Sequence, residues 1–249
     1  MDPLQRGASP GRRLTDVGEG PAVLPLGAHP PHRAFVGQPQ RYDVAGASQF
    51  ALLFLLGLRE HHRLLDFGCG SLRLGRLAIP YLQPDRYFGV EPETGLVDAG
   101  FAHELGEDAR TLKRPRFDSN REWRVDGFGQ RFDFVMAQSV FTHTGEQPAA
   151  RALAAFAGSL APGGLIVSNW LLGPETAGPS VATTDWVYPD FVEFSPARVA
   201  ALAVQAGLHV RACPWPHPSL HWFVMAREES ALPSRARMAA LQVGAPPWD

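Results

Sequence analysis

The sequence has few cysteines and no long apolar run. Its two cysteines, Cys69 and Cys213, are too few for a disulfide framework and lack the spacing of a metal site, so we expect no bound metal. The longest apolar stretch, residues 50–58, is well short of the ~18 residues that a membrane-spanning helix needs. Because the N-terminus also lacks the apolar stretch of a signal peptide, we expect a cytoplasmic protein without a membrane segment.

The sequence also has no large excess of positive or negative charge. The chain has 23 basic and 25 acidic residues, a formal net charge of -2, and Lys113 is its only lysine. A near-neutral chain gives no electrostatic reason to expect nucleic acid or an anionic membrane surface as a partner. The oligomeric state is left open. At 249 residues, 45% of them hydrophobic, the chain is long enough to bury the core of one α/β domain.

The first 40 residues differ in composition from the rest. They hold seven prolines and six glycines without an apolar period, so we expect residues 1–40 to be disordered or loosely ordered. An ordered domain is predicted over residues 41–228, and residues 229–249 are predicted to form a tail with one short helix.

Strand and helix signals alternate through the predicted domain. A first helix is predicted over 46–59, with Phe50, Leu53, Phe54 and Leu58 on one face. The following elements are predicted to be strand 63–67, helix 72–79 stopped by Pro80, strand 87–91, helix 95–105, a weak strand within 115–124, strand 132–137, helix 147–160, a turn at 162–164, strand 165–170, helix 196–206, and strands 208–213 and 220–226.

The last two predicted strands fix the fold class. Six residues separate them, too few for a parallel crossover, so this pair must be antiparallel. We therefore predict an α/β fold with a doubly wound, mostly parallel seven-stranded sheet, helices on both faces and a C-terminal antiparallel hairpin.

One glycine-rich turn carries the chemistry. After a buried strand the sequence reads Asp66-Phe67-Gly68-Cys69-Gly70-Ser71 and opens a helix. Gly68 and Gly70 allow close approach of a ligand, and the N–H groups of a helix start favour negative charge. Glu91 ends the next strand, where a carboxylate can accept both hydroxyl protons of a ribose. The pattern predicts a nucleotide-type cofactor at this turn.

Arg73 indicates which kind of nucleotide cofactor binds at this turn. A dinucleotide-binding turn reads G-x-G-x-x-G, and Arg73 stands where its third glycine would be. A bulky cation there suits a carboxylate better than a pyrophosphate. Asp66 is interpreted as orienting the turn by hydrogen bonds, and Cys69 as a small residue that fills it.

The ordered motifs of residues 42–227 resemble the class I S-adenosylmethionine-dependent methyltransferases, which have a Rossmann-like fold. The segments that carry this resemblance are LLDFGCG, YFGVEPE, RFDFVMAQSVFTH, LAPGGLIVS and GLHVRAC…SLHWFVMAR. Two departures are that Leu72 stands where the family often has a third glycine, and that the weak third strand has no clear Gly-Asp pair.

The resemblance implies S-adenosyl-L-methionine as the cofactor and assigns roles to residues. The backbone from Phe67 through Gly68, Cys69 and Gly70 to Ser71 is expected around its methionine and ribose portion. Glu91 is expected on the ribose hydroxyls and Pro92 against the adenine. Gln138, Ser139 and Val140 are expected near the methionine end, and Asn120 near the adenine amino group.

Candidate substrate residues lie in three further places. His143 follows the fourth predicted strand, and its ordinary pKa suits proton removal, so it is the candidate catalytic residue. The alternative is that His143 only packs or bonds to the backbone. Residues 169–194 are predicted to form a substrate lid, with Trp170, Trp186 and Tyr188 on the substrate, although such aromatics can also pack on one another. His217 and His221 flank the last hairpin turn, where a surface position or a place at the site mouth is possible.

We therefore predict methyl transfer to a small-molecule acceptor, hydrophobic or aromatic and of natural-product type. Some enzymes that resemble this family transfer or cyclise the aminocarboxypropyl arm of the cofactor, or use the bound cofactor only for its positive charge. These reactions remain alternatives to methyl transfer. A nicotinamide-dependent oxidoreductase is disfavoured by Arg73 and the closing hairpin, and a non-catalytic binding protein is disfavoured by the intact motifs.

Overall fold

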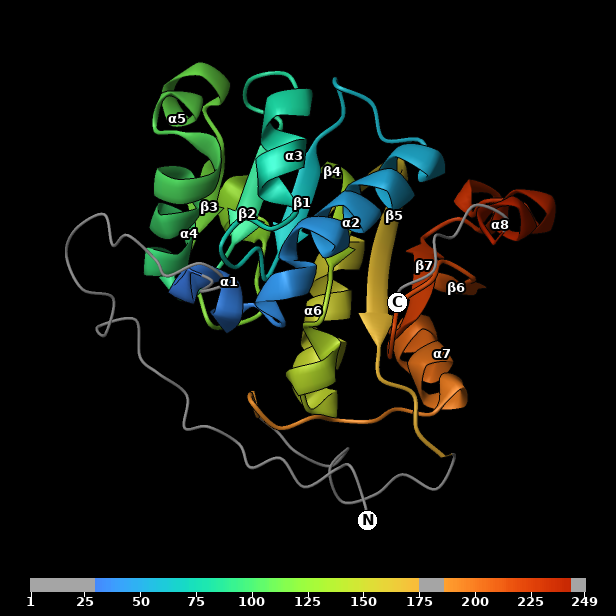
Figure 1. Cartoon of the computed structure of the whole chain (residues 1–249). Helices are drawn as coiled ribbons and strands as arrows, with labels where there is room; N and C mark the ends of the chain where they lie inside the picture. Colours follow the sequence, from blue (N-terminus) through green and yellow to red (C-terminus); the bar gives the residue numbers. More distant parts are fainter. Residues whose placement is uncertain (1–29, 175–185, 243–249) are drawn as a thin grey trace, which may run out of the picture.

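The computed structural model describes residues 30–174 and 186–242 and has a seven-stranded sheet with helices on both faces (Figure 1). The strands lie in the order β3-β2-β1-β4-β5-β7-β6. Strands β1 to β5 pair in parallel, and β7 pairs antiparallel with both β5 and β6. The predicted fold class is therefore confirmed.

The strands are β1 (Leu64–Phe67), β2 (Tyr87–Val90), β3 (Arg116–Asp118), β4 (Phe132–Ala137), β5 (Leu160–Trp170), β6 (His209–Cys213) and β7 (His221–Ala226). The α-helices are α1 (Pro31–Phe35), α2 (Tyr42–Leu56), α3 (Gly75–Tyr81), α4 (Thr94–Gly100), α5 (Asp108–Lys113), α6 (Glu146–Ser159), α7 (Pro196–Gln205) and α8 (Arg235–Leu241). A π-helical turn, η3 (Phe101–Leu105), extends α4, and η2 (Pro39–Arg41), η4 (Asp126–Phe128), η5 (Phe141–His143) and η7 (Glu229–Ala231) are 3-10 turns. In the described ranges, no helix combines the length and the apolar composition needed to cross a membrane.

The two faces of the sheet bury separate apolar layers. One layer packs α2, α3 and α8 against alternate strand residues such as Leu64, Met136 and Val167. The other packs α6 and α7 against the intervening positions, including Leu65 and Val135. Since side chains alternate along a strand, strands β1, β2, β4, β5 and β7 supply both layers.

The order of the strands in the sheet indicates where a ligand-binding crevice lies. Strand β1 lies between β2 and β4, so the chain crosses over to opposite sides at this point. In open α/β sheets, ligands bind outside the carboxyl ends of the strands at such a switch point. The turn after β1, the end of β2 and the loop after β4 all lie at these carboxyl ends.

Four local expectations need correction. Residues 31–35 are helical rather than disordered, while residues 1–29 lie outside the described residues. Phe54 points away from the core with 42% of its surface exposed, because Leu52 and Leu56 take the inner positions of α2. Helix α3 starts at Gly75 and includes Pro80, since residues 71–74 belong to the turn. Strand β5 already begins at Leu160, so the turn predicted at 162–164 lies within it.

Candidate functional site

The turn after β1 is held by its own backbone and that of β2. Gly68 and Gly70 adopt positive φ angles of 73° and 52°, and a Cβ atom on them would lie 2.7 Å from Val140 and 2.6 Å from Val36. Leu72 has a φ of 63°, so a leucine takes the left-handed conformation that a third glycine would adopt. The N–H groups of Gly68 and Cys69 both donate to the carbonyl of Val90, at 2.8 and 3.1 Å.

This bonding corrects the expectation that free N–H groups at the turn attract an anion. The N–H of Gly70 is also engaged, because it donates to the Glu91 carboxylate at 2.9 Å. The N–H groups of Gly68, Cys69 and Gly70 are therefore not free to meet a negative charge on a ligand.

Glu91 lies directly against the turn, as predicted. Its Oε2 accepts from Gly70, and its Oε1 accepts from the N–H of Glu93 at 2.9 Å. Burial raises the pKa of this carboxyl group, whereas the two backbone donors lower it. A carboxylate offers about four acceptor positions. Two remain after these bonds, which is the number that the two ribose hydroxyls need.

Asp66 is a buried acid at the end of β1. The Tyr87 hydroxyl donates to its Oδ2 at 2.6 Å. Burial raises the pKa of Asp66 to about 6, although the Tyr87 bond and the charge of Arg73 act in the opposite direction. The predicted bonds from Asp66 to the turn backbone are absent from the hydrogen bonds of the described residues. The side chain is instead an ionisable group beneath the turn.

Arg73 connects three segments at the cofactor turn. Its Nη1 donates to the carbonyl of Val36 at 2.8 Å, and its Nη2 donates to Oε1 of Gln138. Its Nε is buried and has no hydrogen-bond partner among the described residues. An unpaired buried donor on a cation costs free energy unless an acceptor meets it. This atom therefore marks a place for an anionic or polar ligand group.

The loop after β4 continues this polar network. Gln138 donates through Nε2 to the hydroxyl of Ser139 at 2.6 Å, and the N–H of Ser139 donates to Oδ1 of Asn169 at 2.7 Å. Ser139 has a positive φ of 58°, and Asn169 is completely buried with an unpartnered Nδ2. Gln138, Ser139 and the buried Val140 are therefore brought to the turn, as predicted.

Helix α1 covers the turn from the N-terminal side. Arg33 binds both oxygens of Glu104, at 2.6 and 2.7 Å, and His32 contacts the same carboxylate at 2.8 Å. Both His32 and Glu104 are almost wholly buried. This ion pair holds α1 so that Val36 lies against Gly70. The segment predicted to be disordered thus supplies part of the site.

Asn120, expected near the adenine amino group, lies in the loop after β3. The Asn120 amide donates to the carbonyl of Arg124, and its Oδ1 accepts from Glu122 and Arg124, so its side chain shapes the following loop. Asp118 ends β3 in register with Val90, which precedes Glu91. Asp118 is thus an acid at the strand end next to Glu91, with its Oδ1 accepting from the N–H of Asn120 at 2.9 Å, and Pro92 is half-buried.

His143 lies in a tight loop under the segment 186–194. Its Nδ1 is 2.7 Å from the carbonyl of Asp190, and its backbone carbonyl accepts from Val187 at 2.9 Å. Its ring contacts those of Trp186, Tyr188 and Phe191. Burial lowers the pKa of His143, so the ring is neutral at neutral pH. Since a carbonyl can only accept, Nδ1 carries the proton and Nε2 carries the lone pair.

The remaining predicted residues are spread more widely. Trp170 is fully buried and stacked on Phe141 at 4.2 Å, so it is a core residue rather than a substrate contact. The buried Ser71 faces Tyr42, whose hydroxyl donates to the Ser71 carbonyl at 2.7 Å. His221 is exposed at the start of β7.

Two further residues have strongly shifted pKa values. Burial and the neighbouring cations Arg73 and Arg41 lower the pKa of His217 to about 4, which places this histidine close to the turn, and its Nδ1 accepts from the N–H of Leu220. Burial raises the pKa of the Cys69 thiol well above its ordinary value, in agreement with a structural role.

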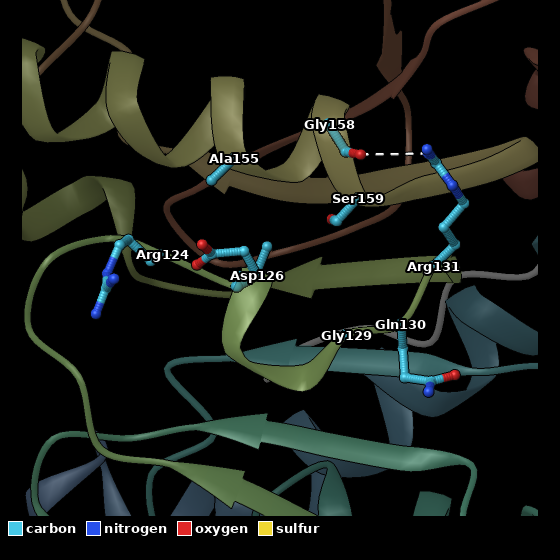
Figure 2. A pocket seen from close by; sticks show the side chains of 9 residues that line it. Arg124, Asp126, Gly129, Gln130, Arg131, Ala155, Gly158 and Ser159 are labelled. Carbon is cyan, nitrogen blue, oxygen red and sulfur yellow. Dashed lines mark hydrogen bonds between the residues drawn. The ribbon is translucent and has the colours of Figure 1, made fainter.

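Two cavities are relevant. The one at the turn is about 20 Å³ and is bordered by Val36, Asp66, Gly68, Arg73 and Gln138. A wider hollow of about 530 Å³ lies between the β3–β4 connection and the end of α6, where Asp126, Gln130 and Arg131 surround it (Figure 2). None of the predicted site residues borders this second hollow, and Arg131 precedes β4 at the opposite end of the strand. It is therefore separate from the site.

Sequence reasoning missed several residues of this site. Phe35 and Val36 fall in a segment whose composition indicated disorder, and no local signal marks them. Trp123 lies in the β3–β4 loop, where its ring stacks on Phe67 at 6.0 Å. Asp118 and Asn169 had a usable signal, because each is polar and stands at or next to the carboxyl end of a strand.

Comparison with known proteins agrees with this geometry. Residues 65–166 match a family model described as a methyltransferase domain. No curated protein matches the chain.

Solved structures share the fold at low identity. The glycopeptide N-methyltransferase MtfA, complexed with S-adenosyl-L-methionine, superposes with a TM-score of 0.57 at 14% identity, over 74% of this chain and 94% of that one. The magnesium protoporphyrin IX methyltransferase of Synechocystis PCC 6803, with bound S-adenosylhomocysteine, gives 0.57 at 12% identity, over 85% and 90%. DesVI of Streptomyces venezuelae gives 0.55 at 18% identity, over 78% and 95%.

The family match begins at Leu65 in β1 and ends at Ile166 in β5, so it spans the turn, the end of β2 and the loop after β4. The sheet order and the antiparallel C-terminal pair extend the likeness beyond that match. Residues 65–166 therefore match a methyltransferase domain, and the sheet has the Rossmann-like fold of the solved methyltransferase structures named above.

Proposed function

We propose that this methyltransferase binds S-adenosyl-L-methionine at the turn after β1 and transfers its methyl group to a small molecule. The observation that carries the proposal is the carboxylate of Glu91. It lies 2.9 Å from the N–H of Gly70 and keeps acceptor positions for two hydroxyl groups. A ribose at this point lies between the turn and the β2 strand end.

Charges at the turn fit the amino-acid end of the cofactor. The methionine portion carries a carboxylate and an ammonium group. Arg73 offers an unpartnered Nε to the carboxylate, and Asp66 offers a buried acid to the ammonium group. The two side chains border the same small cavity at the turn. A zwitterion satisfies both at once, which a dinucleotide pyrophosphate would not.

The adenine is proposed to lie against Pro92 with its amino group toward Asp118. This role replaces the one expected for Asn120, whose amide is committed to the loop. The bound cofactor supplies an electrophilic methyl group on a sulfonium centre. The protein's own task is to hold the acceptor in line with this group and to exclude water.

Cofactor entry requires movement of the α1–Val36 segment. A space of about 20 Å³ is far smaller than the ~300 Å³ or more typical of ligand sites. Val36 fills it by packing on Gly70, and its carbonyl uses Nη1 of Arg73. We propose that the cofactor carboxylate replaces this carbonyl on Arg73 when residues 31–37 shift.

The named neighbours support a small-molecule acceptor without identifying it. One is named as acting on a glycopeptide and another on magnesium protoporphyrin IX. We also propose a cytoplasmic location, and a domain that begins near residue 41 and is followed by a tail over residues 229–249, with helix α1 packed on the domain.

Calorimetric titration with S-adenosyl-L-homocysteine tests the proposal. The wild-type chain should bind one equivalent, and Arg73→Met should weaken binding about tenfold to 100-fold, because a charge-assisted hydrogen bond contributes about 1.5–3 kcal/mol. Arg114→Met is the control, since this arginine pairs with Asp85 at the surface. Equal affinity of the wild type and Arg73→Met would refute the role of Arg73, and no binding to the wild type would refute the proposed function.

A further inference from the structure

Five aromatic rings form an arch around the cofactor turn. The aromatic arch consists of Phe67, Trp123, Trp186, Tyr188 and Phe35, each with its ring centroid 5.8–6.3 Å from the next. It starts at the first residue of the turn motif and ends beside Val36, which covers Gly70. These rings come from β1, the β3–β4 loop, the segment after β5, and α1. Segments far apart in sequence thus present aromatic faces to one site.

Three of the four neighbouring ring pairs in the arch are stacked, whereas Trp123 is tilted by 45° to Trp186, and the arch is open to solvent at Trp186 and Tyr188. Tyr188 lies at 27° to Phe35 and at 19° to Trp186. Trp186 and Tyr188 expose 49% and 40% of their surfaces, and the neighbouring Phe191 exposes 63%. Exposed apolar surface gathered at one place marks a ligand or partner site. Parallel faces favour a flat ligand, because offset stacking is a preferred geometry of aromatic pairs.

Charged groups around the arch are engaged elsewhere. Arg121 pairs with Glu93, and Arg124 lies 3.7 Å from Glu122, so the arginines that flank Trp123 meet carboxylates. In the described part of the chain, no ion pair includes an arch residue or His143. The burial that lowers the pKa of His143 would equally disfavour an ammonium group beside it. The surroundings therefore favour a neutral ligand.

His143 touches the arch on the side of Trp186 and Tyr188, with ring centroids 5.6 and 4.9 Å away. The bond from Nδ1 to the carbonyl of Asp190 fixes the ring and leaves Nε2 as a hydrogen-bond acceptor. No described donor bonds to Nε2.

Resting on the proposed function, we infer that the methyl acceptor is a planar aromatic molecule with a phenolic hydroxyl group, stacked in the aromatic arch with this hydroxyl donating to Nε2 of His143. In the transfer the phenolic O–H bond breaks and its proton passes to Nε2. The oxygen forms a bond to the methyl carbon, and the electron pair of the broken carbon–sulfur bond stays on sulfur, which becomes a neutral thioether.

A binding experiment tests the stacking. Intrinsic tryptophan fluorescence of the full chain, saturated with S-adenosyl-L-homocysteine, should be quenched on titration with 2-naphthol but not with cyclohexanol. Tyr188→Ala should weaken 2-naphthol binding about tenfold, because each stacked ring contributes roughly a factor of ten. Phe54→Ala is the matched control, because Phe54 lies on the outer face of α2 with 42% of its surface exposed. Weaker binding of the homocysteine product in Tyr188→Ala would assign the arch to the cofactor and overturn the inference.

A second variant tests the proton acceptor. His143→Asn keeps an N–H where Nδ1 donates to Asp190 but removes Nε2. Methylation of 2-naphthol should fall about 100-fold or more, as expected for loss of a general base. Methylation of a nitrophenol that is already ionised at pH 8 should stay within about threefold of the wild type. Equal losses on both acceptors, or methylation of 2-naphthylamine in preference to 2-naphthol, would overturn the inference. Unchanged binding of S-adenosyl-L-homocysteine in every variant would leave the proposed function intact.

Discussion

Replacing Glu91 with glutamine should separate cofactor binding from folding. The carboxylate accepts from two backbone N–H groups, of Gly70 and Glu93, with a different oxygen for each. Glutamine keeps one of these oxygens and places an NH₂ group against the other N–H. That donor loses its partner, and the free energy of unfolding should fall by about 1–3 kcal/mol.

The effect on the cofactor follows from the same count of acceptor positions. Two acceptor positions of Glu91 remain for the ribose hydroxyls. Glutamine can serve only one of them, so Glu91→Gln should lose about 1.5–3 kcal/mol of binding free energy, or roughly tenfold to 100-fold in Kd. Glu91→Ala should lose both contacts, which is about 10²–10⁴-fold in Kd.

Titration calorimetry with S-adenosyl-L-homocysteine measures these values, and thermal unfolding shows whether each variant is folded. Glu93→Gln is the matched control, because its carboxylate is paired with Arg121 at the surface and only its backbone touches Glu91. A folded Glu91→Gln with the affinity of the wild type would refute the reasoning.

Three further predictions concern the surroundings of the turn. Burial raises the pKa of Asp66 to about 6, so its protonated form stabilises the fold below pH ~4 and this contribution is lost as the pH rises through about 6. The free energy of unfolding, measured by chemical denaturation, should therefore fall between pH 4 and 7 in the wild type, and Asp66→Asn should remove this pH dependence. A pH dependence of Asp66→Asn equal to that of the wild type would contradict the prediction. Gly68→Ala should lower the free energy of unfolding by about 1–3 kcal/mol more than Gly129→Ala, because both have positive φ but only Gly68 would bring a Cβ within 2.7 Å of Val140; equal losses would show that the contact is unimportant. Glu104→Gln should speed hydrogen exchange in residues 31–36, measured by mass spectrometry, because Arg33 and His32 both bind this buried carboxylate, whereas the exposed Asp98→Asn should leave it unchanged.

The fold was accessible from the sequence because its signals are local. Strand β4 and the glycine turn stand in short apolar runs bounded by turn residues, and the seven-residue connection between β6 and β7 leaves only an antiparallel pairing. Helix α7 also begins at a local signal, because a serine before a proline is typical of a helix start, and the hydroxyl of Ser195 accepts from the N–H of Arg198. Likewise, the acid at the end of β2 meets the turn because both strand ends lie at the same edge of the sheet.

The misassigned residues depend on contacts that are distant in sequence. Helix α1 is ordered by Glu104, which lies 71 residues after Arg33, and a five-residue helix would be marginal on its own. Trp170 has the same composition signal as Trp186, and only the stacking on Phe141 shows that one is core and the other is exposed. The engagement of the turn N–H groups by Val90 follows from strand register, which a glycine pattern alone does not specify.

A crystal structure of the full chain grown with S-adenosyl-L-homocysteine tests the central claim most directly. The account predicts ligand density in which the ribose hydroxyls meet the Glu91 carboxylate and the amino-acid carboxylate meets Arg73, with Val36 displaced from Gly70. Ligand density outside the turn after β1, or a bound ligand that leaves Glu91 without a contact, would contradict it.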